Sequence, residues 1–314
     1  MKAFRIFYLS TLALLSGSLS INAQSSSAGA FPAFSSLASE LGTEATSLAG
    51  ASLARSTGLY SDLLSSPVAM LESPDKLGFG FGYASLMPYF GPDRKMTVSA
   101  AFNNGLFAFG LNTAYSLSPS YPIYNEYGSP TGDFTPSGLR IIFGAGFKIV
   151  KGLSAGVDIK YLRTSEAEDF AMNGFAAGIH LGYTTRRLFA YLGIRNIGPS
   201  VKSEDGTSFP IPGVVAGSVS YSIIDATKSK MFIDAALYAY MNGGIGTSFG
   251  AEYSFDEHFF TRAGYLYASK GAPLASYASI GLGVRFFGVS LNATYLLASK
   301  TLGGTYLIGL SYSL

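Results

Sequence analysis

The sequence has no cysteine and no tryptophan, and only 13% of its 314 residues are charged. In a typical soluble domain about a quarter of the residues are charged, so this composition is unusual for a soluble protein. The absence of cysteine excludes a disulfide framework, although it does not decide the compartment of the protein.

Long apolar runs are also missing. After the first 20 residues no stretch of roughly 18 apolar residues occurs, which excludes a membrane protein built of transmembrane helices. Yet the mean hydropathy is positive at +0.30, and the chain contains 24 phenylalanines and 21 tyrosines. Apolar composition without membrane helices favours a closed β-barrel, the other structure that satisfies every backbone polar group in lipid.

A cluster of basic residues is absent too. The N-terminus has the pattern of a secretory signal: Lys2 and Arg5 precede the apolar stretch 6–15, and a run of mostly small residues follows up to Ala23. Cleavage near Ala23 or Gln24 would remove two positive charges and lower the formal net charge from +2 to about 0. A neutral mature chain argues against nucleic acid as a partner.

The remaining sequence is dominated by an alternation of period two. Apolar residues occupy every second position of 139–149 and again of 153–161, with a break at Val150-Lys151-Gly152. This pattern predicts a β-hairpin with one apolar face. The opposite face carries glycines and a few charges, which would suit the lumen of a barrel, so we expect the apolar face to contact lipid.

The same pattern predicts about fourteen strands, an even number that is typical of bacterial outer-membrane barrels. They are expected near 77–86, 95–103, 105–117, 139–149, 153–164, 170–185, 188–197, 212–224, 230–241, 245–255, 259–269, 274–286, 289–298 and 305–314. The connections after strands two, four, six, ten and twelve are tight, whereas the longest, 118–138 and 198–211, follow strands three and seven. Tight turns are expected on the periplasmic side and long loops outside. The alternative is a soluble β-sandwich, whose strands also alternate.

A segment of different composition precedes the first strand. It contains the small-residue stretch Ala45–Ala54, the pair Leu59-Tyr60 and the turn Ser66-Pro67-Val68-Ala69. These features resemble the N-terminal segment of the PorV/PorQ family of Bacteroidetes outer-membrane proteins, relatives of FadL-type barrels, in which the segment packs into the barrel as a plug. Ser66 stands where the family has Asn. The predicted division is a signal peptide at 1–23, a plug at 24–76 and a barrel at 77–314.

Further motifs extend the resemblance along the chain. They are Lys160-Tyr161-Leu162, Ile194-Arg195-Asn196-Ile197-Gly198-Pro199 with Phe209-Pro210-Ile211-Pro212, Gly250-Ala251-Glu252-Tyr253 with Arg262-Ala263-Gly264-Tyr265, and Gly281-Leu282-Gly283. The resemblance implies an all-β transmembrane antiparallel barrel of fourteen strands with an N-terminal plug, located in a bacterial outer membrane. Some family members act in type IX secretion, so exported cargo proteins and secretion subunits are the partners it implies.

A set of polar side chains is predicted to face the lumen. We expect a lumen polar network of Arg140, Lys148, Asp158, Lys160, His180, Arg195, Asp234, Glu252, Arg262 and Arg285. Buried charges must be paired, so this network would hold the plug through Glu40, Glu44 or Asp62. A polar path or ligand site is the alternative. No catalytic set, metal site or cofactor motif is recognised, and an enzyme is not expected.

The loop 119–136 combines Tyr121, Tyr124 and Tyr127 with four prolines. Tyrosines on a stiff loop suit protein recognition, while contact with the membrane surface is the ordinary alternative. Two functions therefore stay open: an interaction protein of type IX secretion that docks partners on its extracellular loops, and a FadL-like channel that takes up hydrophobic small molecules.

Overall fold

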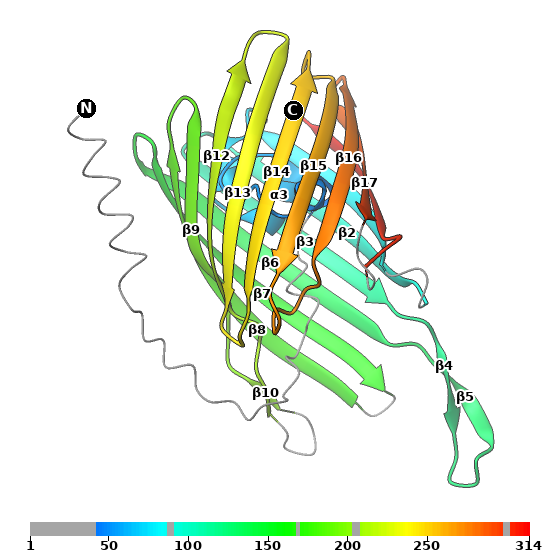
Figure 1. Cartoon of the computed structure of the whole chain (residues 1–314). Helices are drawn as coiled ribbons and strands as arrows, with labels where there is room; N and C mark the ends of the chain where they lie inside the picture. The colour runs from blue at the N-terminus through cyan, green and yellow to red at the C-terminus, as the bar shows by residue number, and fades with distance from the viewer. Residues whose placement is uncertain (1–41, 87–90, 168–169, 203–207, 298–301) are drawn as a thin grey trace. The chain divides into compact units, whose positions relative to one another are not determined.

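The structure is a computed structural model that describes residues 42–86, 91–167, 170–202, 208–297 and 302–314. Within these ranges, fourteen antiparallel strands form a closed barrel in the order β1-β18-β17-β16-β15-β14-β13-β12-β9-β8-β7-β6-β3-β2 (Figure 1). The first strand pairs with the last, so the sheet has no free edge. The predicted fold class, an all-β barrel of about fourteen strands, is confirmed.

The strands agree with the predicted ranges to within a few residues at each end. They are β1 (Leu77–Leu86), β2 (Asp93–Asn103), β3 (Phe107–Leu117), β6 (Ser137–Val150), β7 (Leu153–Ala167), β8 (Phe170–Thr184), β9 (Leu188–Ile197), β12 (Val214–Asp225), β13 (Ser229–Tyr240), β14 (Ile245–Phe255), β15 (Phe259–Ala268), β16 (Tyr277–Phe286), β17 (Val289–Leu297) and β18 (Tyr306–Ser313).

The two faces of the sheet differ as the alternation predicts. In β8, Ile179 is 63% exposed on the outside, whereas the next residue, His180, is 1% exposed on the inside. In the hairpin of β6 and β7, Phe143 and Val157 point outward while Arg140 and Asp158 are buried in the lumen. The outer surface is therefore an apolar belt of the kind that contacts hydrocarbon in a membrane.

Connections alternate between the two ends of the barrel. The tight turns lie at the end where Lys76 N donates to Leu314 O, beside the C-terminus (Figure 1). At one of them Gly152 has a φ of +82° and no room for a side chain, because a Cβ would lie 2.7 Å from Thr184 O. We refer to this end as the inner end and to the end with the long connections as the outer end.

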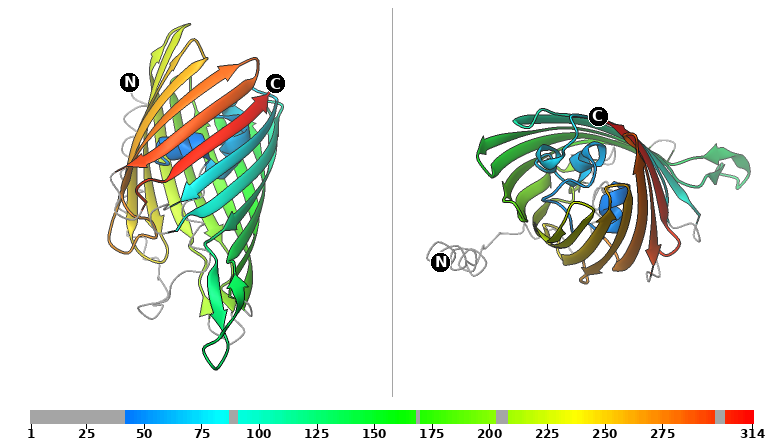
Figure 2. Two further views of the ribbon diagram at one scale, coloured as in Figure 1. Left: turned by 90° about the vertical axis from the view of Figure 1, so that its right-hand side faces the viewer. Right: turned by 90° about the horizontal axis from the view of Figure 1, so that it is seen from above.

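Both of the longest connections contain small hairpins that the sequence pattern did not predict. In the connection from β3 to β6, β4 (Tyr121–Tyr124) pairs with β5 (Pro130–Phe134), and the hairpin projects beyond the barrel wall (Figures 1 and 2). The connection from β9 to β12 contains β10 (Val201–Lys202) and β11 (Ser208–Phe209). Val201 and Ile211 of this connection pack on Leu162 and Met172, so these described residues lie against the inside of the barrel mouth.

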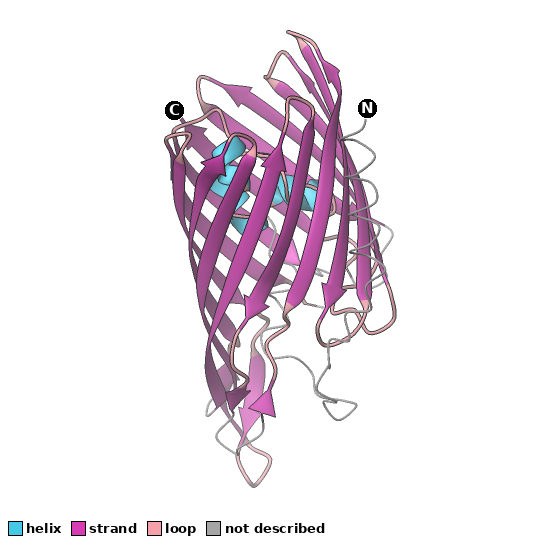
Figure 3. Cartoon of the chain, turned by 90° about the vertical axis from the view of Figure 1, so that its left-hand side faces the viewer, coloured by secondary structure: helices cyan, strands magenta, loops and turns pink. Residues whose placement is uncertain are grey.

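Residues 42–76, which we call the inner segment, lie inside the barrel, as the view along its axis shows (Figure 2). They form helices α2 (Thr43–Ser47) and α3 (Leu59–Ser65) and the 3-10 helix η2 (Ala69–Glu72), drawn in cyan in Figure 3. Helix α2 contacts β15 to β18, and α3 contacts β1 to β3 and β18. The part 24–41 of the predicted plug and the predicted signal peptide lie outside the described residues, and the division into signal, plug and barrel stays a prediction.

Glycines on the inner face of the wall allow this close packing. A Cβ at Gly264 would lie 2.6 Å from Ala49 N, and one at Gly146 would lie 2.6 Å from Pro67 O. The backbone of the inner segment therefore rests directly on the backbone of the wall. This packing accounts for the abundance of glycine in the inward-facing series of the strands.

Candidate functional site

Arg55 of the inner segment is the centre of the main polar network in the lumen. Its Nε and Nη2 donate to the two carboxylate oxygens of Asp234 at 3.1 and 3.0 Å, and its Nη1 donates to Glu252 Oε1 at 2.9 Å. The guanidinium also lies 4.4 Å from the ring centroid of Phe232. Arg55, Asp234 and Glu252 are all buried. This bidentate pair joins the segment to β13 and β14.

The network continues around the wall to helix α2. Arg262 Nε donates to Glu252 Oε2 at 2.5 Å, and Arg262 Nη1 donates to Asn292 Oδ1 at 2.9 Å. Asn292 Nδ2 in turn donates to Glu44 Oε1 at 2.8 Å, and the Tyr60 hydroxyl bonds the same oxygen. Burial raises the pKa of the Glu44 carboxyl, and the positive charge of Arg262 opposes this shift in pKa.

A second cluster lies on β7, β8 and β9. His180 Nε2 is 2.5 Å from Asp158 Oδ2, and His180 Nδ1 is 2.9 Å from the Tyr191 hydroxyl. Lys160 Nζ lies 3.8 Å from Asp158 Oδ1 and donates to Asn196 Oδ1 at 2.5 Å. Asn196 has a φ of +58° at an irregularity between β8 and β9, where both it and Arg195 are buried.

The other predicted network residues have different partners. Arg195 Nη2 donates to Leu64 O at 2.9 Å, and Arg140 Nη2 donates to Asn112 Oδ1 at 3.4 Å. Arg285 Nη2 donates to Asp75 Oδ1 at 2.7 Å. The positive charge of Lys148 acts on Glu72, whose pKa is raised by burial and lowered in part by that charge.

The expected partners in the segment are only partly those observed. Glu44 does bind a wall residue, but Asp62 accepts hydrogen bonds from Ser56 Oγ and from the backbone nitrogens of Thr57 and Gly58, all within the segment. Burial raises the pKa of Asp62 to about 7. Asp62 therefore shapes the loop before α3 and does not tie the segment to the wall. Glu40 lies outside the described residues.

Sequence reasoning missed Arg55, although a signal was present. Arg55 is the one basic residue of 42–75, in a stretch of mostly small residues. Two acidic residues were expected on the opposing wall, and a lone cation in a buried segment must find such partners. Residues 66–69 form a turn, in which Ala69 N donates to Ser66 O at 3.1 Å and lies 3.4 Å from Ser66 Oγ.

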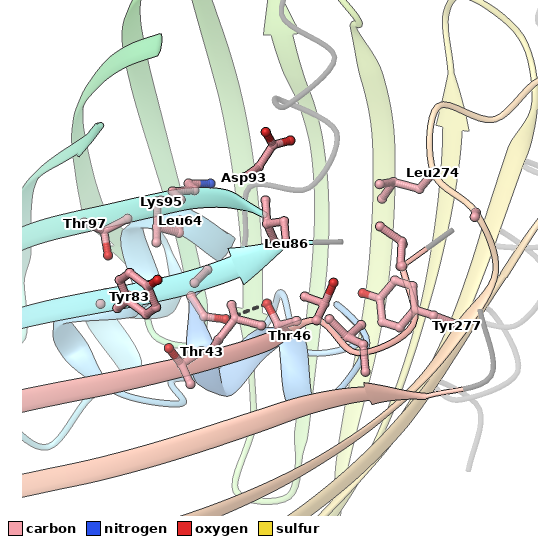
Figure 4. Close-up of a pocket in the computed structure, with 18 of the residues that line it drawn as sticks. Thr43, Thr46, Leu64, Tyr83, Leu86, Asp93, Lys95, Thr97, Leu274 and Tyr277 are labelled. Atoms are coloured by element: carbon pink, nitrogen blue, oxygen red, sulfur yellow. Dashed lines mark hydrogen bonds between the residues drawn. The ribbon is translucent and has the colours of Figure 1, made fainter. Parts of the chain in front are cut away.

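An apolar cavity of about 360 Å³ opens between the inner segment and the outer half of the wall (Figure 4). We call it the outer pocket. Its lining comes from the outer ends of β1, β2, β16, β17 and β18, the connection before β16, and the inner segment. The lining residues are Gly42, Thr43, Thr46, Leu64, Gly82, Tyr83, Ala84, Leu86, Asp93, Lys95, Thr97, Pro273, Leu274, Ala275, Tyr277, Leu296, Leu302, Thr305 and Leu307.

The outer pocket is mostly apolar, with its few charges on one side. Tyr277, Leu296 and Leu307 belong to a buried hydrophobic cluster against which Leu86, Leu274 and Leu302 pack. The ionisable side chains Asp93 and Lys95 both come from β2 and stand apart from Leu274 and Tyr277 (Figure 4). Such a cavity can hold an apolar molecule of moderate size.

A second cavity of about 260 Å³, the inner cavity, lies at the inner end of the barrel. In contrast to the outer pocket, its lining is rich in charged and hydroxyl groups, among them Glu44, Arg55, Glu252, Arg262 and Arg285. Tyr60 also lines it. The inner segment thus has an apolar cavity on one side and a polar cavity on the other.

The three tyrosines of the predicted docking loop lie on the β4–β5 hairpin. Tyr124 and Tyr127 are 60% and 90% exposed. Tyr121 is partly held in place, because its ring packs 5.7 Å from that of Phe134 and its hydroxyl donates to Glu166 O at 2.8 Å. Two of the three side chains are therefore open to solvent on a projecting element.

Comparisons with known proteins identify the fold. No protein-family model and no curated protein matches the chain. Among solved structures, the toluene transporter TodX of P. putida matches with a TM-score of 0.63 at 13% identity, covering 87% of this chain and 98% of TodX. The CymD monoaromatic hydrocarbon channel matches with a TM-score of 0.61 at 13% identity, covering 87% and 97%. A FadL homologue of Pseudomonas aeruginosa matches with a TM-score of 0.50 at 13% identity, covering 87% of this chain and 95% of the homologue.

The chain has the FadL-like barrel fold. The predicted relation to FadL-type barrels is confirmed at the level of the fold, whereas nothing in these matches points to the PorV/PorQ family or to secretion. At such low sequence identities these structural matches show the fold alone.

Proposed function

We propose that this chain is an outer-membrane channel that binds and takes up small apolar molecules, with single-ring aromatic hydrocarbons as the substrate class. The observation that carries the proposal is the outer pocket: an apolar cavity of about 360 Å³ inside a membrane barrel, at the end that carries the long connections. An engineered apolar cavity of about 150 Å³ is large enough to bind benzene, so this volume accommodates a substituted single ring.

Two neighbours on β18 provide a matched test. Leu307 lines the outer pocket, and the adjacent Ile308 is 44% exposed on the outer surface. A Leu307→Trp side chain would fill part of the pocket, whereas Ile308→Trp adds the same ring on the lipid side. We expect Leu307→Trp to reduce the uptake of radiolabelled toluene by Gram-negative cells that carry this chain as their only such channel, and Ile308→Trp to leave uptake unchanged. Equal uptake by both variants would contradict the proposal.

The projecting hairpin favours a second candidate function. Exposed aromatic side chains on a rigid element are typical anchors of protein interfaces, and Tyr124 and Tyr127 have this arrangement. A role in docking exported cargo or type IX secretion subunits, as the PorV/PorQ resemblance implies, would use this hairpin. Pull-down of such proteins from native outer membrane with this chain tests that role, and their absence would count against it.

A further inference from the structure

The outer pocket and the inner cavity are separated by very few side chains of the inner segment. Thr43 and Thr46 of α2 line the outer pocket, whereas Glu44 of the same helix lines the inner cavity. In α3, Leu64 lines the outer pocket and Tyr60 lines the inner cavity. The boundary between the two cavities is therefore the contact between α2 and α3.

Tyr60 and Glu44 make a side-chain hydrogen bond across this contact. The Tyr60 hydroxyl bonds Glu44 Oε1, which also accepts a hydrogen bond from Asn292. The other oxygen, Glu44 Oε2, is buried and has no hydrogen-bond partner among the described residues. Since an unsatisfied buried oxygen opposes burial, Glu44 is the weak point of an otherwise well-bonded network.

The ring of Tyr60 occupies space that the wall leaves empty. A Cβ at Gly80 would overlap the Tyr60 ring, and a Cβ at Gly309 would lie 3.0 Å from the Tyr60 hydroxyl. Because β1 and β18 present no side chains at these positions, the Tyr60 ring fills the space beside Gly80, and Tyr60 shares the space beside Gly309 with Thr43. Withdrawal of Tyr60 would leave a passage along the inside of the wall.

Among the described residues, the strands beside the outer pocket show no break in their pairing. The pairings of β1 with β2, β1 with β18, β17 with β18 and β16 with β17 run without a register shift. A sideways exit at the pocket would break ladder hydrogen bonds in the hydrocarbon region, where the freed groups find no partners. Moving α3 away from α2 breaks hydrogen bonds that side chains make, such as Tyr60 to Glu44 and Arg195 Nη2 to Leu64 O, and leaves the strand ladder intact.

We propose that a solute leaves the outer pocket along the barrel axis, between α2 and α3, and that Tyr60 with Glu44 forms the gate into the inner cavity. This inference rests on the proposed uptake function and specifies its route. The solute class is the same, small apolar molecules. The polar inner cavity then serves as the exit, where an apolar solute is bound weakly and released.

A removable tether tests the route in this cysteine-free chain. A Cβ at Gly78 would lie 3.4 Å from Leu59 Cβ, close to the Cβ separation of about 3.5–4.5 Å found in disulfides. The double variant Leu59→Cys/Gly78→Cys would fix α3, next to Tyr60, to β1. We expect loss of toluene uptake in the oxidised variant and recovery after reduction with dithiothreitol. Unchanged uptake in the oxidised protein, verified as cross-linked, would overturn the axial route.

Binding is measured in parallel to separate the two proposals. The chain has no tryptophan, so Tyr277→Trp in the outer pocket gives a fluorescence signal without background. Quenching by bromobenzene in the tethered protein, together with lost toluene uptake, supports both proposals. Quenching with unchanged uptake refutes only the gate. Absence of quenching in the untethered reporter refutes the binding site, and with it the gate that depends on it.

Conductance through planar bilayers gives an independent result. We expect Tyr60→Ala to conduct ions because the ring no longer fills the space beside Gly80. Tyr60→Phe keeps the ring, loses the bond to Glu44 and is expected to stay closed. A closed Tyr60→Ala channel that shows heat-modifiable, folded mobility on gels would overturn the assignment of Tyr60 as the gate.

Discussion

Replacement of Arg55 by Met should loosen the inner segment without unfolding the barrel. Asp234 would lose both of its hydrogen bonds to Arg55 and remain buried. Glu252 would keep its ion pair with Arg262, whose Nε lies 2.5 Å from Glu252 Oε2. Removing one partner of a buried ion pair costs about 3–5 kcal/mol, mostly because an uncompensated charge stays behind. The Arg55 side chain takes no part in the hydrogen bonds between the strands, so the barrel itself should stay folded. The cost should therefore shift the equilibrium between the docked and undocked segment by a factor of about 10² or more.

Hydrogen–deuterium exchange in detergent micelles measures this shift directly. Amides of residues 43–65 should exchange about a hundredfold faster in Arg55→Met, while amides of β13 and β14 keep their protection. The matched control is Lys230→Met, which removes an exposed pair with Glu257 at 2.5 Å; such pairs contribute about 0–1 kcal/mol. Arg55→Met combined with Asp234→Asn should recover most of the protection. If Arg55→Met and Lys230→Met behave alike, the buried network does not hold the segment.

Three further predictions concern the faces of the barrel and the hairpin. Leu310→Lys, on the lipid face, should lower the free energy of unfolding by about 2–4 kcal/mol if it lies near the bilayer midplane. Ser311→Lys, on the lumen side, should carry no such penalty from lipid. Equal urea midpoints for the two variants, measured on barrels folded into vesicles, would refute the assigned facing. Gly80→Ala should raise ion conductance, because its methyl group displaces the Tyr60 ring; an unchanged closed state would argue against that contact. Changing Tyr121, Tyr124 and Tyr127 together to Ser should leave toluene uptake intact and, if the hairpin docks proteins, abolish recovery of partners in pull-downs, whereas retained partners would exclude the docking role.

The barrel was predictable from sequence because every strand obeys a simple physical rule. A lipid-facing side chain such as Ile179 must be apolar, and its neighbour His180 must suit the lumen, so the period of two identifies both the strand and its facing. The turns were equally visible where two or three residues separate two alternating runs. The facing of Arg140, Asp158, Asp234 and Glu252 follows from the same rule.

The interior was far less predictable, since its elements are short and irregular. Helices α2 and α3 have five and seven residues, too few for a helical period to emerge, and their conformation depends on packing against the wall. Gly146 shows the same limit. The alternation places it on the lumen face, but it does not reveal that Pro67 O lies 2.6 Å from where a Cβ would be. Contacts of this kind join residues that are distant in the chain.

The proposed binding of small aromatic molecules is tested most directly by a crystal structure of the protein soaked with bromobenzene, whose bromine is located by anomalous scattering. We expect a bromine peak inside the outer pocket, between Leu64, Leu274 and Leu307. A peak found solely on the lipid-facing surface, or an absence of any peak in the pocket at saturating ligand, would contradict it.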